Sequence, residues 1–101
     1  MKPMDFADLR VRLRVFIPRI LEDILPRGKM KGNGYVAYNP HRLDKNLGSF
    51  RINIITGKWA DFATKDRGGD IISLYAYVKG YSSKLQAAKE LKELYLGGNN
   101  E

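Results

Sequence analysis

Basic side chains recur through the middle of the chain, with an aromatic ring among them. The cations that could contact a polyanion there are Arg42, Lys45, Arg51, Lys58, Lys65 and Arg67, and the aromatic is Phe62. Cations of this kind bind the phosphates of a nucleic acid, and an exposed ring stacks on its bases. The pattern therefore predicts a binding surface for a single-stranded nucleic acid.

Two adjacent glycines follow this basic stretch. Gly68 and Gly69 precede a predicted helix that starts near Asp70. Glycine lets the backbone turn sharply and approach a neighbour closely, and the amides at a helix start can receive a phosphate. We therefore include both glycines in the predicted nucleic-acid site.

Few residues in this sequence could catalyse a reaction or hold a metal. There is no cysteine, which excludes disulfides, a thiol nucleophile and any cysteine-based zinc site. The single histidine, His41, has no evident serine or acidic partner nearby in the sequence. Asp61, Asp66 and Asp70 could form an acidic metal set, but the lysine and arginine between them favour ion pairs and a helix cap. We predict a non-catalytic domain without a cofactor or metal.

Composition predicts a small, single, basic domain. The chain has 101 residues, 44% of them hydrophobic and 11% aromatic, which is enough for one compact core. Its net charge is +7, and residues 27–70 carry nine Lys and Arg against four Asp and Glu. The excess charge is thus concentrated in the centre of the chain, which favours a basic patch.

The sequence shows no targeting or membrane signal. No apolar run approaches the ~18 residues of a transmembrane span. Four arginines interrupt the apolar residues near the N-terminus, so no secretory signal is apparent there. We expect a cytoplasmic protein that binds neither a membrane nor a small-molecule substrate.

The basic and aromatic residues lie on a predicted β-hairpin. Residues 49–55 and 58–63 have the composition of strands, and Thr56 with Gly57 supplies a two-residue turn. That turn places Ile54 opposite Trp59. Phe50, Ile52, Ile54 and Trp59 then form an apolar face, and Arg51, Asn53, Ile55, Lys58 and Phe62 form the other. We assign Trp59 to the core rather than to base stacking.

The remaining elements predict an α+β fold. Residues 34–38 form a third strand, which gives a three-stranded antiparallel sheet packed against three to four helices. The helices are expected over residues 4–25, with a break at Pro18, over 70–79 and over 84–96. One domain covers residues 1–96, and residues 97–101 are a polar tail or linker. Residues 27–34 are either a flexible connector or a phosphate-contacting loop that uses Arg27, Lys29 and Lys31.

Four stretches of the chain carry a resemblance to a known family. They are YVAYNP at 35–40, GSF at 48–50, TGKWADFA at 56–63 and GGDIISL at 68–74. In this order they resemble the N-terminal zinc-binding domain of bacterial and phage DNA primases. They are most similar to the cysteine-free version in primase-helicases of prophages, plasmids and mobile elements.

The resemblance implies a zinc-ribbon-like fold without zinc. The family's second cysteine pair falls on Asp61 and Thr64, and its first pair falls near residues 38–41. Without the metal, we expect Trp59 and the N-terminal helix to replace its stabilising effect, and Asp61 to accept hydrogen bonds from loop amides.

The resemblance also implies a function. In this family the domain is an accessory module that engages single-stranded template DNA, and the catalytic centre lies in another domain. Its expected partners are single-stranded DNA and a helicase or primase catalytic domain. Two alternatives stay open: a module that docks on a replicative helicase or polymerase domain, and a small stand-alone DNA-binding regulator.

Overall fold

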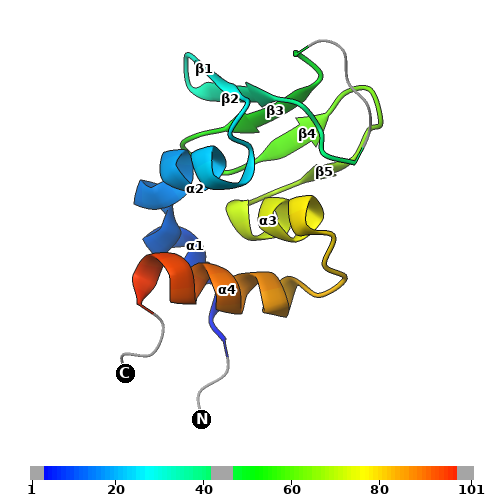
Figure 1. Cartoon of the computed structure of the whole chain (residues 1–101). Helices are drawn as coiled ribbons and strands as arrows, with labels where there is room; N and C mark the ends of the chain where they lie inside the picture. Colours follow the sequence, from blue (N-terminus) through cyan, green and yellow to red (C-terminus); the bar gives the residue numbers. More distant parts are fainter. Residues whose placement is uncertain (1–3, 42–46, 98–101) are drawn as a thin grey trace.

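The computed structural model describes residues 4–41 and 47–97 and has an α+β fold, as predicted. The helical elements are α1 (Phe6–Leu13), the 3-10 turn η1 (Arg14–Phe16), α2 (Ile17–Ile24), α3 (Ile71–Lys79) and α4 (Lys84–Leu96). The strands are β1 (Lys29–Lys31), β2 (Gly34–Ala37), β3 (Phe50–Asn53), β4 (Trp59–Asp61) and β5 (Arg67–Gly68). All helices lie on one side of the sheet, and α2 and α3 are the nearest to it (Figure 1).

The sheet is larger than predicted, with five antiparallel strands in the order β1-β2-β3-β4-β5. The prediction of three strands was wrong because both edge strands are short and lack an apolar alternation. In the basic stretch at residues 27–34, which was predicted as a connector or a phosphate-contacting loop, residues 29–34 therefore belong to a β-hairpin and Arg27 lies in the turn before it. This stretch forms β1 and a tight turn at Gly32 and Asn33, in which Gly32 has a φ of +63°.

The hairpin of β3 and β4 has a different register from the predicted one. Ile52 pairs with Trp59, and a four-residue loop replaces the two-residue turn. The chain turns early because the Asn53 side chain accepts bonds from the amides of Ile55 and Thr56, at 2.8 and 3.0 Å. The register shifts by two residues, so every side chain keeps its predicted face. Gly57 has a positive φ of +82°, as its place in the turn predicted.

The N-terminal helix breaks where Pro18 predicted a break. The 3-10 turn η1 ends α1, and α2 then begins at Ile17, so that Pro18 lies in its first turn. Proline is tolerated there because the first amides of a helix have no partner within the helix. Leu9, Leu13 and Ile20 stay buried through the break. No helix in the described part of the chain is long and apolar enough to cross a membrane.

The hydrophobic core lies between the helices and one face of the sheet. Phe50, Ile52 and Trp59 enter it from β3 and β4, and Ile72 and Leu74 enter it from α3. Alternate residues of β3 are exposed, and none of the described helices covers the opposite face of the sheet (Figure 1). We call that opposite surface the open face.

Candidate nucleic-acid interface

A row of paired residues crosses the open face from one edge of the sheet to the other. Lys29 pairs with Val36, Val36 with Arg51, Arg51 with Ala60, and Ala60 with Arg67. Residues that pair across antiparallel strands share a face of the sheet. This row therefore carries a basic side chain on β1, on β3 and on β5. The three residues are Lys29, Arg51 and Arg67, and all three are exposed.

A second row lies beside the first. Lys31 pairs with Gly34, and Gly34 pairs with Asn53. The Asn53 amide then donates a 2.8 Å hydrogen bond to the Lys58 carbonyl oxygen, which continues the row into the start of the next strand. Lys31 and Lys58 are both exposed, so this row adds two cations to the open face.

A shallow groove of about 890 Å³ runs over the open face. It is lined by Asn33, Gly34, Arg51, Ile52, Asn53, Lys58, Trp59, Ala60, Phe62, Arg67, Gly68 and Gly69. Four of these residues are Gly or Ala, and their small size makes the surface hollow there. The Phe62 ring is 67% exposed and lines the groove as an available stacking surface.

Six of the nine predicted site residues line this groove. They are Arg51, Lys58, Phe62, Arg67, Gly68 and Gly69. Lys65 is exposed in the turn after β4 and does not line it. Arg42 and Lys45 lie outside the described residues. The structure thus brings together most of a set that is spread over 19 positions of the sequence, from Arg51 to Gly69.

The prediction missed the two lysines of β1. Lys29 and Lys31 were considered as loop residues and were left out of the predicted site. The available signal was the Gly32-Asn33 pair, a typical two-residue hairpin turn that joins β1 to β2. With that turn recognised, alternation places both lysines on one face of the edge strand.

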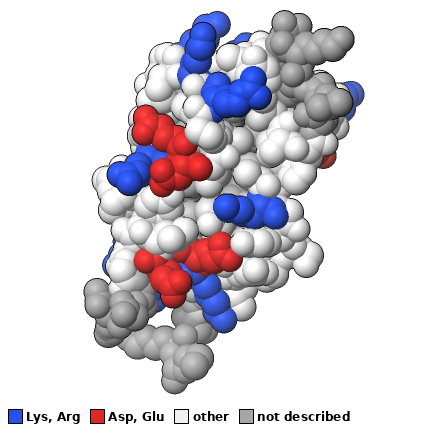
Figure 2. Space-filling model, viewed as in Figure 1, with Lys and Arg blue, Asp and Glu red and all other residues white. Residues whose placement is uncertain are grey.

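The cations of the open face are available to a ligand. Among the described residues, Lys29, Lys31, Lys58 and Arg67 form no ion pair, and the Arg51 Nε donates to the Gly48 carbonyl oxygen at 2.7 Å. Several helix cations are paired instead, namely Arg10, Arg12, Arg19 and Lys84. In the view of Figure 2, most acidic side chains lie over the helices, whereas basic ones predominate at the sheet end.

The start of α3 already holds a carboxylate. Asp70 is the N-cap, and its Oδ1 accepts a 2.8 Å hydrogen bond from the Ser73 amide. Its Oδ2 lies 3.1 Å from Lys84 Nζ and 3.6 Å from an Arg10 nitrogen. The predicted helix cap is thus present. The Asp70 carboxylate thus takes the position of an anion at the Ser73 amide, and a phosphate contact with the Gly68 and Gly69 amides stays a prediction.

Gly68 packs closely against the side chains of Trp59 and Ser73. Its Cα packs on the Trp59 indole, whose Nε1 donates a 2.9 Å hydrogen bond to Ser73 Oγ. A methyl group on Gly68 would overlap both Trp59 and Ser73. Trp59 itself is buried against Phe50 and Tyr77, at centroid distances of 6.0 and 4.6 Å. Trp59 therefore belongs to the core, as predicted, and supports the floor of the groove.

We expect Gly68→Ala to lower the free energy of unfolding by about 2 kcal/mol, the usual cost of overpacking a tight contact. Urea unfolding followed by Trp59 fluorescence would measure the change. Gly69→Ala is the matched control, because nothing lies within 4 Å of a methyl group at that position. Equal stability of the two variants would contradict the assigned contact.

A buried polar cluster holds the far end of the hairpin. Asn39 Nδ2 donates to Asp61 Oδ2 and to the Tyr77 hydroxyl, both at 2.8 Å. Asp61 Oδ1 accepts from the amides of Ala63 and Thr64 at 2.8 and 3.3 Å. These bonds match the expectation that Asp61 binds loop amides. Both Asn39 and Asp61 are essentially inaccessible, at 1% and 0% exposure.

The cluster continues to the surface through Tyr77. The Tyr77 hydroxyl donates to Asp66 Oδ2 at 2.8 Å, and the Tyr77 carbonyl oxygen contacts His41 Nε2. Burial, together with the Asp66 contact, raises the pKa of Tyr77, so its hydroxyl remains a donor at neutral pH. Within the described ranges 4–41 and 47–97, no three His, Asp or Glu side chains are grouped to hold a metal ion.

Comparisons of the chain with protein-family models, with characterised proteins and with solved structures found no match.

Proposed function

We propose that this chain is a non-catalytic module that binds single-stranded DNA on the open face of its sheet. One observation carries the proposal: cations on β1, β3 and β5 form a single row, without ion pairs among the described residues, beside an exposed Phe62. Phosphates would contact the cations, and a base would stack on the ring. We further propose that the module works in the cytoplasm.

The shape of the sheet favours a single strand over a duplex. Neighbouring strands twist by roughly 20–25°, so side-chain directions turn by about 90° across five strands. A flexible single strand can follow such a curved row, whereas a stiff duplex cannot. Within residues 4–41 and 47–97, no helix lies on the open face, where it could enter a major groove (Figure 1).

The resemblance to primase domains suggests where such a module would act. In that family, zinc joins the segment before the hairpin to the end of the hairpin. Here the same two places are joined by the hydrogen bond between Asn39 and Asp61. A hydrogen bond in the place of the zinc supports the proposal that this chain is a zinc-free relative of the template-binding domain and serves a primase or primase-helicase. A helicase or primase catalytic domain is then the proposed protein partner.

The proposal is tested by the binding of a fluorescein-labelled oligo(dT) at 50–300 mM salt. Wild type should bind with an affinity that falls steeply as salt rises, because binding phosphates releases counterions. Lys58→Ala combined with Arg67→Ala should weaken binding by about 10- to 100-fold. It should also reduce the slope of log K against log salt by about 1.4, at ~0.7 per phosphate contact. The melting temperature should stay within about 2 °C, because both side chains are exposed.

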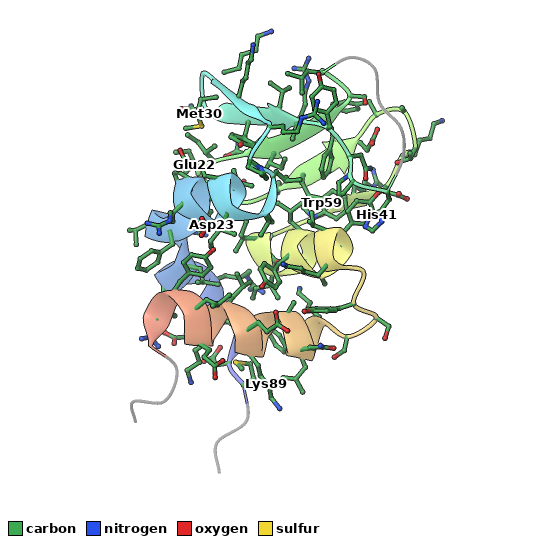
Figure 3. All side chains as sticks on the ribbon, in the orientation of Figure 1. Glu22, Asp23, Met30, His41, Trp59 and Lys89 are labelled. Carbon is green, nitrogen blue, oxygen red and sulfur yellow. The ribbon has the colours of Figure 1, made fainter. Side chains whose placement is uncertain are left out.

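The matched control is Arg14→Ala combined with Lys89→Ala. It removes one arginine and one lysine from exposed helix positions, and Lys89 lies on the side of α4 turned away from the sheet (Figure 3). Its affinity should stay within about twofold of wild type. Equal losses of affinity in the two double variants would mean that net charge alone determines binding, and would contradict the proposed site. Absence of oligonucleotide binding would overturn the proposal and favour a module that docks on a helicase or polymerase domain. Tighter binding to duplex than to single-stranded DNA would favour a stand-alone DNA-binding regulator.

A further inference from the structure

The groove on the open face reaches the turn that joins β1 to β2. It extends from Gly68 and Gly69 at one side of the sheet to Asn33 and Gly34 at the other. Lys31 pairs with Gly34, so this lysine lies at the far end of the groove. Lys29 lies two pairs further along the same strand and begins the row that ends at Arg67.

The alternation of β1 directs both lysines to the open face. Met30 lies between them in sequence and pairs with Tyr35, a core residue. Figure 3 shows Met30 above Glu22, on the side of β1 that faces α2. Side chains on either side of Met30 must then project to the opposite face. All three residues of β1 are exposed, so nothing in the described chain covers the lysines.

We propose that the bound strand crosses the sheet at right angles to the β-strands, from the β5 edge to the β1 edge. Lys29 and Lys31 bind the phosphates that lie at the β1 edge. This inference rests on the proposed function and adds to it the path and length of the ligand. Arg67 and Arg51 bind the phosphates nearer the β5 edge, and the Phe62 ring stacks on a base near that edge.

The dimensions of the sheet set the number of nucleotides. Adjacent strands lie about 4.8 Å apart, so the row spans about 19 Å from β1 to β5. A single strand rises about 3.4 Å per nucleotide when stacked and about twice that when stretched, so three to six nucleotides cover the row. This number is close to the low end of the range for single-strand-binding modules, about four nucleotides.

The test is the affinity of oligo(dT) of two to twelve nucleotides for wild type and for Lys29→Gln combined with Lys31→Gln. For wild type we expect affinity to rise steeply up to about six nucleotides and only slowly beyond. The double variant should bind an eight-nucleotide strand about tenfold more weakly than wild type. It should bind a two-nucleotide strand equally well, because a strand shorter than the row of about 19 Å occupies only the β5 end.

Met30→Lys is the control for position. It adds a cation to the same strand but on the helix side, so affinity for the eight-nucleotide strand should stay within twofold. Three results would overturn the inference while leaving the proposed function intact: unchanged binding by the glutamine variant, an equal loss at both lengths, or a gain from Met30→Lys. Absence of binding by wild type at every length would instead overturn the proposed function, and this inference with it.

Discussion

Reversing two charges on the open face, by Arg51→Glu with Arg67→Glu, is expected to weaken single-stranded DNA binding by about a thousandfold at 50 mM salt. In the proposed binding mode, each change would remove a phosphate contact and place a carboxylate where a phosphate would lie. Losing such contacts and juxtaposing like charges together cost several kcal/mol, and about 4 kcal/mol corresponds to a thousandfold. The two residues occupy one row with only Ala60 between them, so a strand in the groove meets both.

The measurement is the same oligo(dT) titration, with circular dichroism and thermal melting to monitor the fold. Arg51 contacts the Gly48 carbonyl oxygen, so a melting temperature lowered by a few degrees is acceptable. Arg14→Glu with Lys89→Glu changes the net charge equally on the helical side and should weaken binding by less than about tenfold. Comparable losses in both variants would show that overall charge governs binding and would refute the open-face site.

The second large effect concerns stability. Asp61→Ala is expected to lower the free energy of unfolding by about 3 kcal/mol, because it leaves one buried and two partly buried donors without their acceptor. Those donors are the Asn39 amide group and the backbone amides of Ala63 and Thr64. In a small domain this loss is a large part of the total stability. Urea unfolding at neutral pH would measure it.

Asp61→Asn is the informative companion variant. It keeps the shape of the side chain and one acceptor oxygen for the loop amides, but turns the other oxygen into a donor that faces Asn39. We expect an intermediate loss, smaller than that of alanine. Thr64→Ala changes an exposed side chain in the same turn and should cost under about 1 kcal/mol. If Asp61→Ala were as stable as Thr64→Ala, the cluster would not stabilise the hairpin.

Much of the fold could be predicted because its signals are local. Pro18 marked the break between α1 and α2, and Ser83 marked the start of α4, where its side chain accepts from the Gln86 amide. Both effects involve neighbours within one helical turn. The faces of the hairpin were equally predictable, because side chains alternate along each strand and the register differs from the predicted one by an even number of residues.

The candidate site was predictable only in part, because the missing residues come from distant segments. Alternation along the predicted hairpin identified Lys58 and Phe62, and Arg67 was predicted from its place in the loop that follows. Lys29 and Lys31 enter the open face only because β1 pairs with β2. That strand has three residues and no apolar pattern, so its existence depends on the backbone hydrogen bonds of its partner.

The sequence by itself thus determined the helix boundaries, the α+β class and the face of each hairpin residue. Tertiary structure decided the two edge strands, the early turn at Asn53 and the single row from Lys29 to Arg67. The reason is physical. Caps and alternation act between residues that are close in the chain, whereas strand pairing joins segments whose proximity exists only after the core has formed.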